Sequence, residues 1–158
     1  SDELDRFGLA LYNLDRCGYG HLVDPWVSPS EIALPELLRR GQRIQFAFID
    51  GWHSFDHTLV DFFYVNKMLD VGGVVTFHDV VHPNVAKVIR HVRTYPSYQL
   101  YGHARKPKPL FSTYRKGIER AIAYLLFLIR RLKPYRPNCV ALQKIAEDRR
   151  EWTWFKDF

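Results

Sequence analysis

The sequence predicts an α/β fold built on a doubly wound, mostly parallel sheet. Short segments rich in β-branched and aromatic residues alternate with longer segments whose apolar residues recur at helical spacing. Such alternation is typical of parallel strands joined by helices. Two consecutive expected strands are also followed directly by acidic or histidine residues. The carboxyl ends of parallel strands are where open α/β sheets bind their ligands.

The first half of the chain predicts four elements. A helix over 3–16 is expected because its apolar residues are spaced three or four apart, and a short strand is expected over 21–27. Ser30 is a natural N-cap for a helix running to about residue 40, where a glycine ends it. The segment 43–50, with the sequence RIQFAFID, predicts a strand that ends in an acid.

The second half continues the alternation. A helix over 56–69 precedes a Gly72-Gly73 turn, and a strand over 74–77 leads into His78 and Asp79. We expect the aromatic tail of the chain to pack behind the last strand. The remaining elements are expected over 83–93 (helix), near 98–101 (strand) and over 138–145 (strand).

The net charge of +6 is concentrated in one segment. Residues 105–136 hold ten Lys/Arg and one acid, whereas the rest of the chain holds thirteen bases and sixteen acids. A nucleic-acid-binding protein would distribute its positive charge over the folded surface, so we expect no nucleic-acid partner. We interpret the chain as a single domain, 1–158, with a basic insertion at about 103–137.

The helix expected over 117–132 inside this insertion allows three interpretations. It is a solvated face with one buried turn, a lid over a substrate, or a helix that contacts a membrane surface through 105–136. The positive charge also favours an anionic acceptor molecule.

The N-terminal residues, the length of the apolar runs and the cysteines predict a cytoplasmic protein. The N-terminal residues are acidic where a signal peptide is basic, and no apolar run approaches the roughly 20 residues that span a bilayer. Cys17 and Cys139 form no metal or redox spacing and are expected to be free thiols.

The candidate catalytic and metal-binding residues follow two of the expected strands. Asp50 and His53 follow the strand over 43–50, and His78 and Asp79 follow the strand over 74–77. If the two strands are neighbours, these four side chains meet at one rim of the sheet. Two carboxylates with one or two imidazoles can bind a divalent ion, and a free imidazole can act as a general base. Four further histidines are expected at the surface or in helix packing: His57, His82, His91 and His103.

The segment FIDGWHSFDHTLVDFFYVNKMLDVGGVVTFHD resembles a known family pattern. In class I S-adenosylmethionine-dependent methyltransferases related to macrocin and cephamycin O-methyltransferases, a strand ends in I-D-G-x-H. A helix with an internal acid, here Asp61, follows, and then Gly-Gly and a strand ending in an acidic or His-Asp pair. The segment from Ser30 to Pro35 is similar to an S-x-x-x-L-P element of that fold, and residues 138–145 are similar to its closing antiparallel strand.

The resemblance implies a Rossmann-like fold, S-adenosylmethionine as cofactor and a divalent metal, with Mg²⁺ expected. Asp50 and Asp79 match metal-ligand positions, with His78 as a third ligand. His53 matches a catalytic base or orienting residue. Ser30 and Asp50 match positions next to the cofactor.

The chain departs from the family pattern at its N-terminal end. The Gly-rich turn and the first strands of the fold are absent, so the sheet is expected to be incomplete and to contain a gap. The resemblance therefore implies the C-terminal portion of the family fold. Either the chain is a fragment or truncated product, or another chain completes the sheet, or the packing is rearranged.

The function expected from these residues is metal-assisted O-methylation of a small-molecule or sugar-type acceptor. Two alternatives remain open. One is a non-catalytic remnant that self-associates as a homo-oligomer through its open sheet edge. The other is a metal-dependent hydrolase that uses His53, His78, Asp79 and His82.

Overall fold

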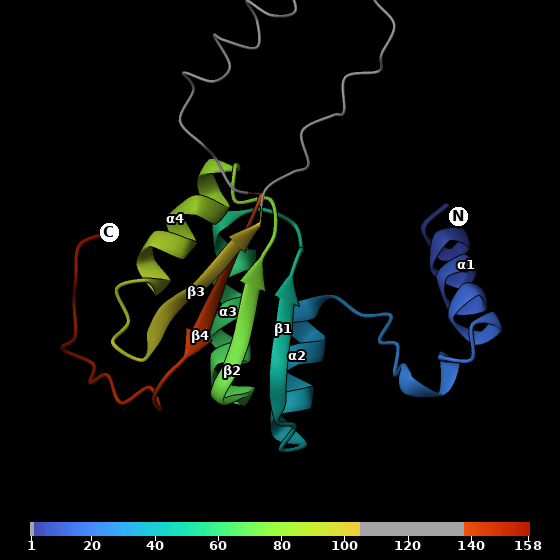
Figure 1. Cartoon of the computed structure of the whole chain (residues 1–158), viewed down its shortest axis with the longest axis horizontal. Coiled ribbons are helices and arrows are strands. Elements are labelled where there is room, and N and C mark those ends of the chain that lie inside the picture. Colours follow the sequence, from blue (N-terminus) through green and yellow to red (C-terminus); the bar gives the residue numbers. More distant parts are fainter. Residues whose placement is uncertain (1, 105–137) are drawn as a thin grey trace, which may run out of the picture.

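The computed structural model describes residues 2–104 and 138–158 (Figure 1). Most of the basic insertion, including the helix expected over 117–132, lies outside the described residues. The helices are α1 (Asp2–Arg16), α2 (Ser30–Arg39), α3 (Phe55–Met68) and α4 (Pro83–Val92), with a 3₁₀ turn η1 (Gly20–Leu22). The strands are β1 (Ile44–Ile49), β2 (Leu69–Phe77), β3 (Tyr98–Ala104) and β4 (Cys139–Lys144).

The four strands form one sheet in the order β1-β2-β4-β3. β1 and β2 pair in parallel, and β4 pairs antiparallel with both β2 and β3. Three of the four strands therefore run in the same direction, and only β4 runs against them (Figure 1). The expected α/β class with a mostly parallel sheet is confirmed. The last expected strand is antiparallel, as expected, and lies between β2 and β3.

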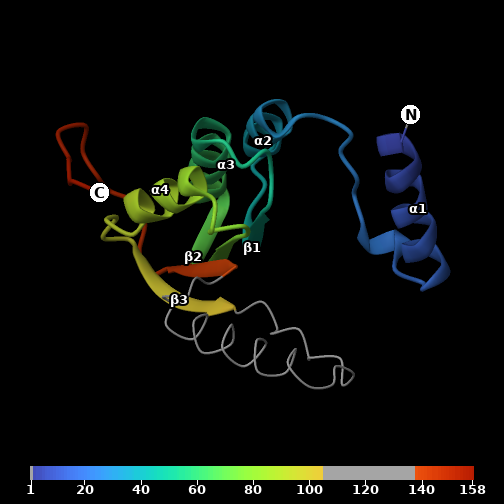
Figure 2. The same cartoon turned by 90° about the horizontal axis from the view of Figure 1, so that it is seen from above.

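Helices α2, α3 and α4 lie together on one face of the sheet (Figure 2). The core forms between these helices and the strands, and its centre is Phe62 of α3, which is 1% exposed. Its ring contacts the rings of Phe77, Tyr95 and Tyr98, with centroids 5.4 to 5.9 Å away. Helix α1 lies apart from the sheet in both views (Figures 1 and 2).

The prediction of a strand over 21–27 is wrong. Residues 20–22 form η1, and the segment from Val23 onward runs to α2 without strand pairing. Leu22 and Val27 are 70% and 75% exposed, so the apolar residues of this segment bury little surface. Pro25 also lacks the N–H that a paired strand donates.

The Gly72-Gly73 pair lies inside β2 instead of forming a turn before it. Helix α3 passes directly into β2 at Leu69, and the pairing with β1 shifts between Ile44↔Leu69 and Phe46↔Val74. Gly72 has φ +92°, and a Cβ on Gly73 would lie 2.9 Å from the backbone oxygen of Asp70. The two glycines therefore permit an irregularity in the strand that other residues would resist.

The aromatic tail packs behind the sheet only in part. Trp154 contacts Tyr95 edge-on at 5.4 Å, whereas Trp152 and Phe155 are 96% and 78% exposed. Arg150 contacts the same region. Its guanidinium lies 3.1 Å from the Tyr95 ring centroid. It also donates two hydrogen bonds of 2.7 Å to the carboxylate of Asp148. These bonds lower the pKa of Asp148 to about 2, against the opposing effect of burial.

In the part of the chain that the structure describes, no helix has the length and apolar character needed to cross a membrane.

Candidate metal centre

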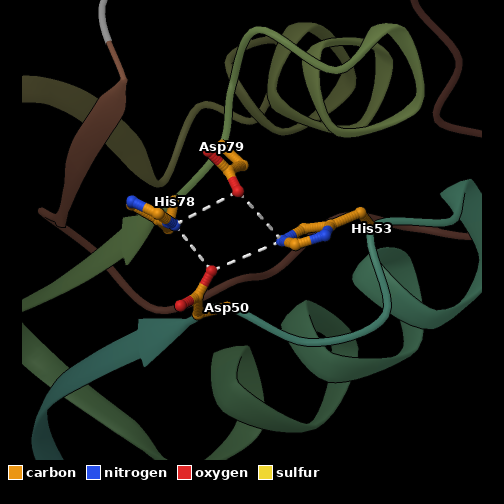
Figure 3. A group of neighbouring side chains, drawn as sticks. All are labelled: Asp50, His53, His78 and Asp79. Atoms are coloured by element: carbon orange, nitrogen blue, oxygen red, sulfur yellow. Dashed lines mark hydrogen bonds and ion pairs between the residues drawn. The ribbon is translucent and has the colours of Figure 1, made fainter. Parts of the chain in front are cut away.

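Four side chains converge at one rim of the sheet: Asp50, His53, His78 and Asp79 (Figure 3). Each offers one ligand atom, and these four atoms all lie within 4.8 Å of one another. Asp50 Oδ1 lies 2.7 Å from His78 Nδ1 and 3.4 Å from His53 Nε2. Asp79 Oδ2 lies 3.6 Å from each of the same two nitrogens. The carboxylates and imidazoles therefore alternate around a common centre.

The parallel pairing of β1 with β2 brings these residues together. Asp50 follows β1 directly, and His78 and Asp79 follow β2 directly. The backbone N–H of His78 donates to the carbonyl of Ile49 at 3.0 Å, which keeps the two strand ends in register. The loop after Asp50 is short, because Ser54 already caps α3 by accepting a hydrogen bond from the backbone N–H of His57. His53 is thereby held next to the strand ends.

Two of the four residues have an unusual backbone conformation. His53 has φ +57° and Asp79 has φ +47°, and they are the only non-glycine residues with positive φ among those described. This conformation costs of the order of 1–3 kcal/mol for each such residue and concentrates at functional sites. Both strained positions in the described chain thus belong to the same four-residue cluster.

Neighbouring side chains fix the two imidazoles. The amide nitrogen Nδ2 of Asn138, directly before β4, lies 2.6 Å from Nε2 of His78, on the ring edge opposite the cluster. The ring of His53 stacks on that of His82, with centroids 5.2 Å apart and planes within 2°. His82 was expected to be a surface or helix-packing residue. It is exposed at the N-cap of α4, as expected, and its ring also lies against one member of the cluster.

A hollow of about 490 Å³ opens beside β1 and brings together the two residues predicted to contact the cofactor, Ser30 and Asp50. Asp61 of α3 lies at its wall and is only 7% exposed. Burial raises the pKa of Asp61, and a hydrogen bond with Ser30 opposes that shift. The apolar lining comes from α2, α3 and β1: Leu34, Leu37, Ile44, Ala47, Phe48, Ile49, Val65 and Met68.

The predicted convergence of the four residues is therefore confirmed, while their individual roles stay predictions. Among the other histidines, His57 contacts the Ser54 hydroxyl at 2.8 Å, and His91 packs against aromatic rings. The side chain of His103 lies outside the described part. Sequence reasoning missed Asn138, which lies 60 residues from His78 and has no local motif.

Residues 3–80 match the methyltransferase domain family. The matched segment ends just after Asp79 and contains all four residues of the cluster together with Ser30. The match supports a methyltransferase family for the chain, while the macrocin and cephamycin branch stays a prediction. No curated protein matches the sequence.

Proposed function

We propose that this chain acts as an S-adenosylmethionine-dependent methyltransferase that methylates an oxygen of a small-molecule or sugar-type acceptor with help from a divalent metal. One observation carries the proposal. The segment that matches a methyltransferase domain places two carboxylates and two imidazoles around one point at the carboxyl ends of β1 and β2. This is the rim of an α/β sheet at which ligands bind.

The hollow beside β1 is the proposed place for part of the cofactor. Its polar side chains are Ser30, Gln42, Asp50 and Asp61, and the hollow adjoins the four-residue cluster because Asp50 belongs to both. Its remaining lining is mostly apolar, which suits the largely apolar surface of a small-molecule site. A cofactor bound there lies next to the rim where an acceptor meets the cluster.

The donors in the cluster fit a divalent metal ion. The cluster contains two carboxylate oxygens and two imidazole nitrogens, and it holds two residues in a costly backbone conformation. A bound divalent ion lowers the pKa of a coordinated hydroxyl and so favours its attack on the methyl group of the cofactor. The chain's own residues would hold and orient the acceptor hydroxyl. His53 was assigned the role of base by resemblance, but its Nε2 atom faces both carboxylates. That orientation favours a ligand role for Nε2.

The acceptor is proposed to be anionic. The support is the net positive charge of residues 105–136, which join β3 to β4 in the sequence and lie outside the described part. A membrane-surface contact through the same residues is a separate proposal with the same support.

Cofactor binding tests the proposed function directly. Calorimetric titration with S-adenosylmethionine, with and without a divalent metal, is expected to give saturable binding. Ser30→Ala is expected to weaken that binding roughly 3- to 10-fold, the effect of losing one hydrogen bond. Ser28→Ala is the matched control, because Ser28 is exposed and does not line the hollow. A cooperatively folded protein that binds no cofactor under either condition would contradict the proposal.

Self-association is a second candidate function, and the edge of the sheet favours it. β1 lies at the end of the strand order, so its outer backbone groups have no strand partner in the described sheet. Phe46 and Phe48, two residues apart on this strand, are 60% and 52% exposed. An apolar open edge promotes pairing with another chain.

We therefore expect association that depends on concentration and on β1. The double variant Phe46→Lys/Phe48→Lys should shift the protein towards monomer in light scattering, because charged side chains oppose edge pairing. Leu22→Lys serves as a control, since Leu22 is 70% exposed but lies outside the sheet. A protein that is strictly monomeric at every concentration excludes this candidate.

A further inference from the structure

The donor atoms of the cluster select a class of metal that differs from the expected Mg²⁺. Mg²⁺ prefers oxygen ligands in proteins, whereas imidazole nitrogens suit Zn²⁺ and neighbouring transition-metal ions. Half of the ligand atoms offered here are imidazole nitrogens, Nε2 of His53 and Nδ1 of His78. We propose that the cluster is a site for a zinc-class divalent transition metal, and that Asn138 is the residue that positions its His78 ligand. This proposal rests on the proposed function for its biological setting, but not for its test.

His53 is the fourth ligand in this proposal. Its Nε2 lies within 3.6 Å of both carboxylate oxygens, so an ion held by the carboxylates would also be within reach of this nitrogen. The left-handed backbone of His53 and the flat stack on His82 hold the ring in place. A ring held in this way loses little conformational freedom when it binds a metal.

Asn138 is buried and has one unsatisfied atom. It is 8% exposed, its Nδ2 lies 2.6 Å from Nε2 of His78, and its Oδ1 has no hydrogen-bond partner in the described structure. With Nδ2 as the donor, Nε2 of His78 is the acceptor. In the neutral ring the proton then sits on Nδ1 and is donated to Asp50 Oδ1 at 2.7 Å. A buried carbonyl oxygen without a donor is costly.

Metal binding through Nδ1 of His78 would change which atom of Asn138 faces the ring. The nitrogen that binds a metal must be unprotonated, and the other ring nitrogen then carries the proton. A half-turn of the Asn138 carboxamide places Oδ1 where Nδ2 was, so that Oδ1 accepts the hydrogen bond from Nε2–H. The ring keeps one proton throughout, which moves from Nδ1 to Nε2 by exchange with solvent. Asn138 can therefore present its carbonyl oxygen as the acceptor that a metal-bound His78 needs at Nε2–H.

The test is metal binding by the full chain, measured by calorimetry and by the visible absorption of bound Co²⁺. One zinc-class ion is expected to bind per chain and to remain bound in a large excess of Mg²⁺. Asn138→Ala is expected to weaken metal binding about 10- to 100-fold, the usual effect of removing such a partner. Asn138→Asp restores an acceptor for Nε2–H and is expected to recover most of the affinity. Asn84→Ala is the matched control, because Asn84 is exposed on α4.

The outcomes separate this inference from the proposed function. Binding of Mg²⁺ in preference to Zn²⁺ and Co²⁺, or equal metal affinity in Asn138→Ala and the wild type, overturns the inference. If Asn138→Ala does not fold, Asn138→Asp decides: a folded variant with a Co²⁺ spectrum unlike that of the wild type also overturns it. Metal binding without cofactor binding supports the inference and contradicts the proposed function. Cofactor binding without binding of a zinc-class metal supports the proposed function and contradicts the inference.

Discussion

Asp50→Ala is expected to weaken metal binding by at least about 100-fold, more than the loss of a residue that only positions a ligand. Asp50 Oδ1 faces both imidazoles, at 2.7 Å from His78 and 3.4 Å from His53. Its removal therefore deletes one ligand and the hydrogen-bond partner of another. The measurement is a calorimetric titration with Zn²⁺, with thermal unfolding to confirm that the variant folds.

The side chain of Asp50 is 44% exposed, so the alanine variant should keep its fold. Asp24→Ala is the control for this experiment, because Asp24 is exposed and lies between η1 and α2, outside the cluster. An Asp50→Ala protein with the metal affinity of the wild type would show that these four side chains form a hydrogen-bond cluster and not a metal site.

Phe62→Ala is expected to lower the free energy of unfolding by about 3–5 kcal/mol. Phe62 is almost completely buried and contacts three aromatic rings from β2, β3 and the segment between α4 and β3. Its truncation leaves a cavity at the point where helix α3 meets the sheet. Because single domains are stabilised by only about 5–15 kcal/mol, this loss removes a large share of the total stability.

The neighbouring residue gives a matched control. Phe63 is 51% exposed, and Phe63→Ala is expected to change the free energy of unfolding by only about 0.5 kcal/mol. Chemical denaturation of both variants measures the difference. Equal destabilisation by the two substitutions would contradict the assignment of Phe62 to the centre of the core.

The sequence predicted the elements that are strongly periodic or clearly capped. The strand over 44–49, the helix beginning after Ser54 and the helix after His82 all follow local rules of alternation and capping. The strand expected over 21–27 failed because strand formation depends on a pairing partner, and the described sheet ends at β1. The Gly72-Gly73 pair was misplaced because glycine permits an irregular strand as readily as a turn.

The candidate site, like the fold, could be predicted only in part. Asp50 and Asp79 follow consecutive strands, so parallel pairing alone predicts that they meet. Asn138 could not be predicted, because its position beside His78 requires β4 to insert antiparallel next to β2. The register Phe77↔Val140 places it there, and the backbone N–H of Val80 donates to its carbonyl at 3.2 Å. Such a placement is set by tertiary structure and leaves no mark on the local sequence.

X-ray absorption at the zinc edge of the metal-loaded protein tests the central claim most directly, because imidazole rings give a distinctive multiple-scattering pattern. We expect one bound ion per chain, with nitrogen and oxygen ligands at about 2.0–2.2 Å and scattering from two imidazoles. The contribution of one ring should disappear in His53→Ala. A shell of oxygen ligands without imidazole scattering, or a folded protein that retains no metal, would contradict the assignment of Asp50, His53, His78 and Asp79 as a metal centre.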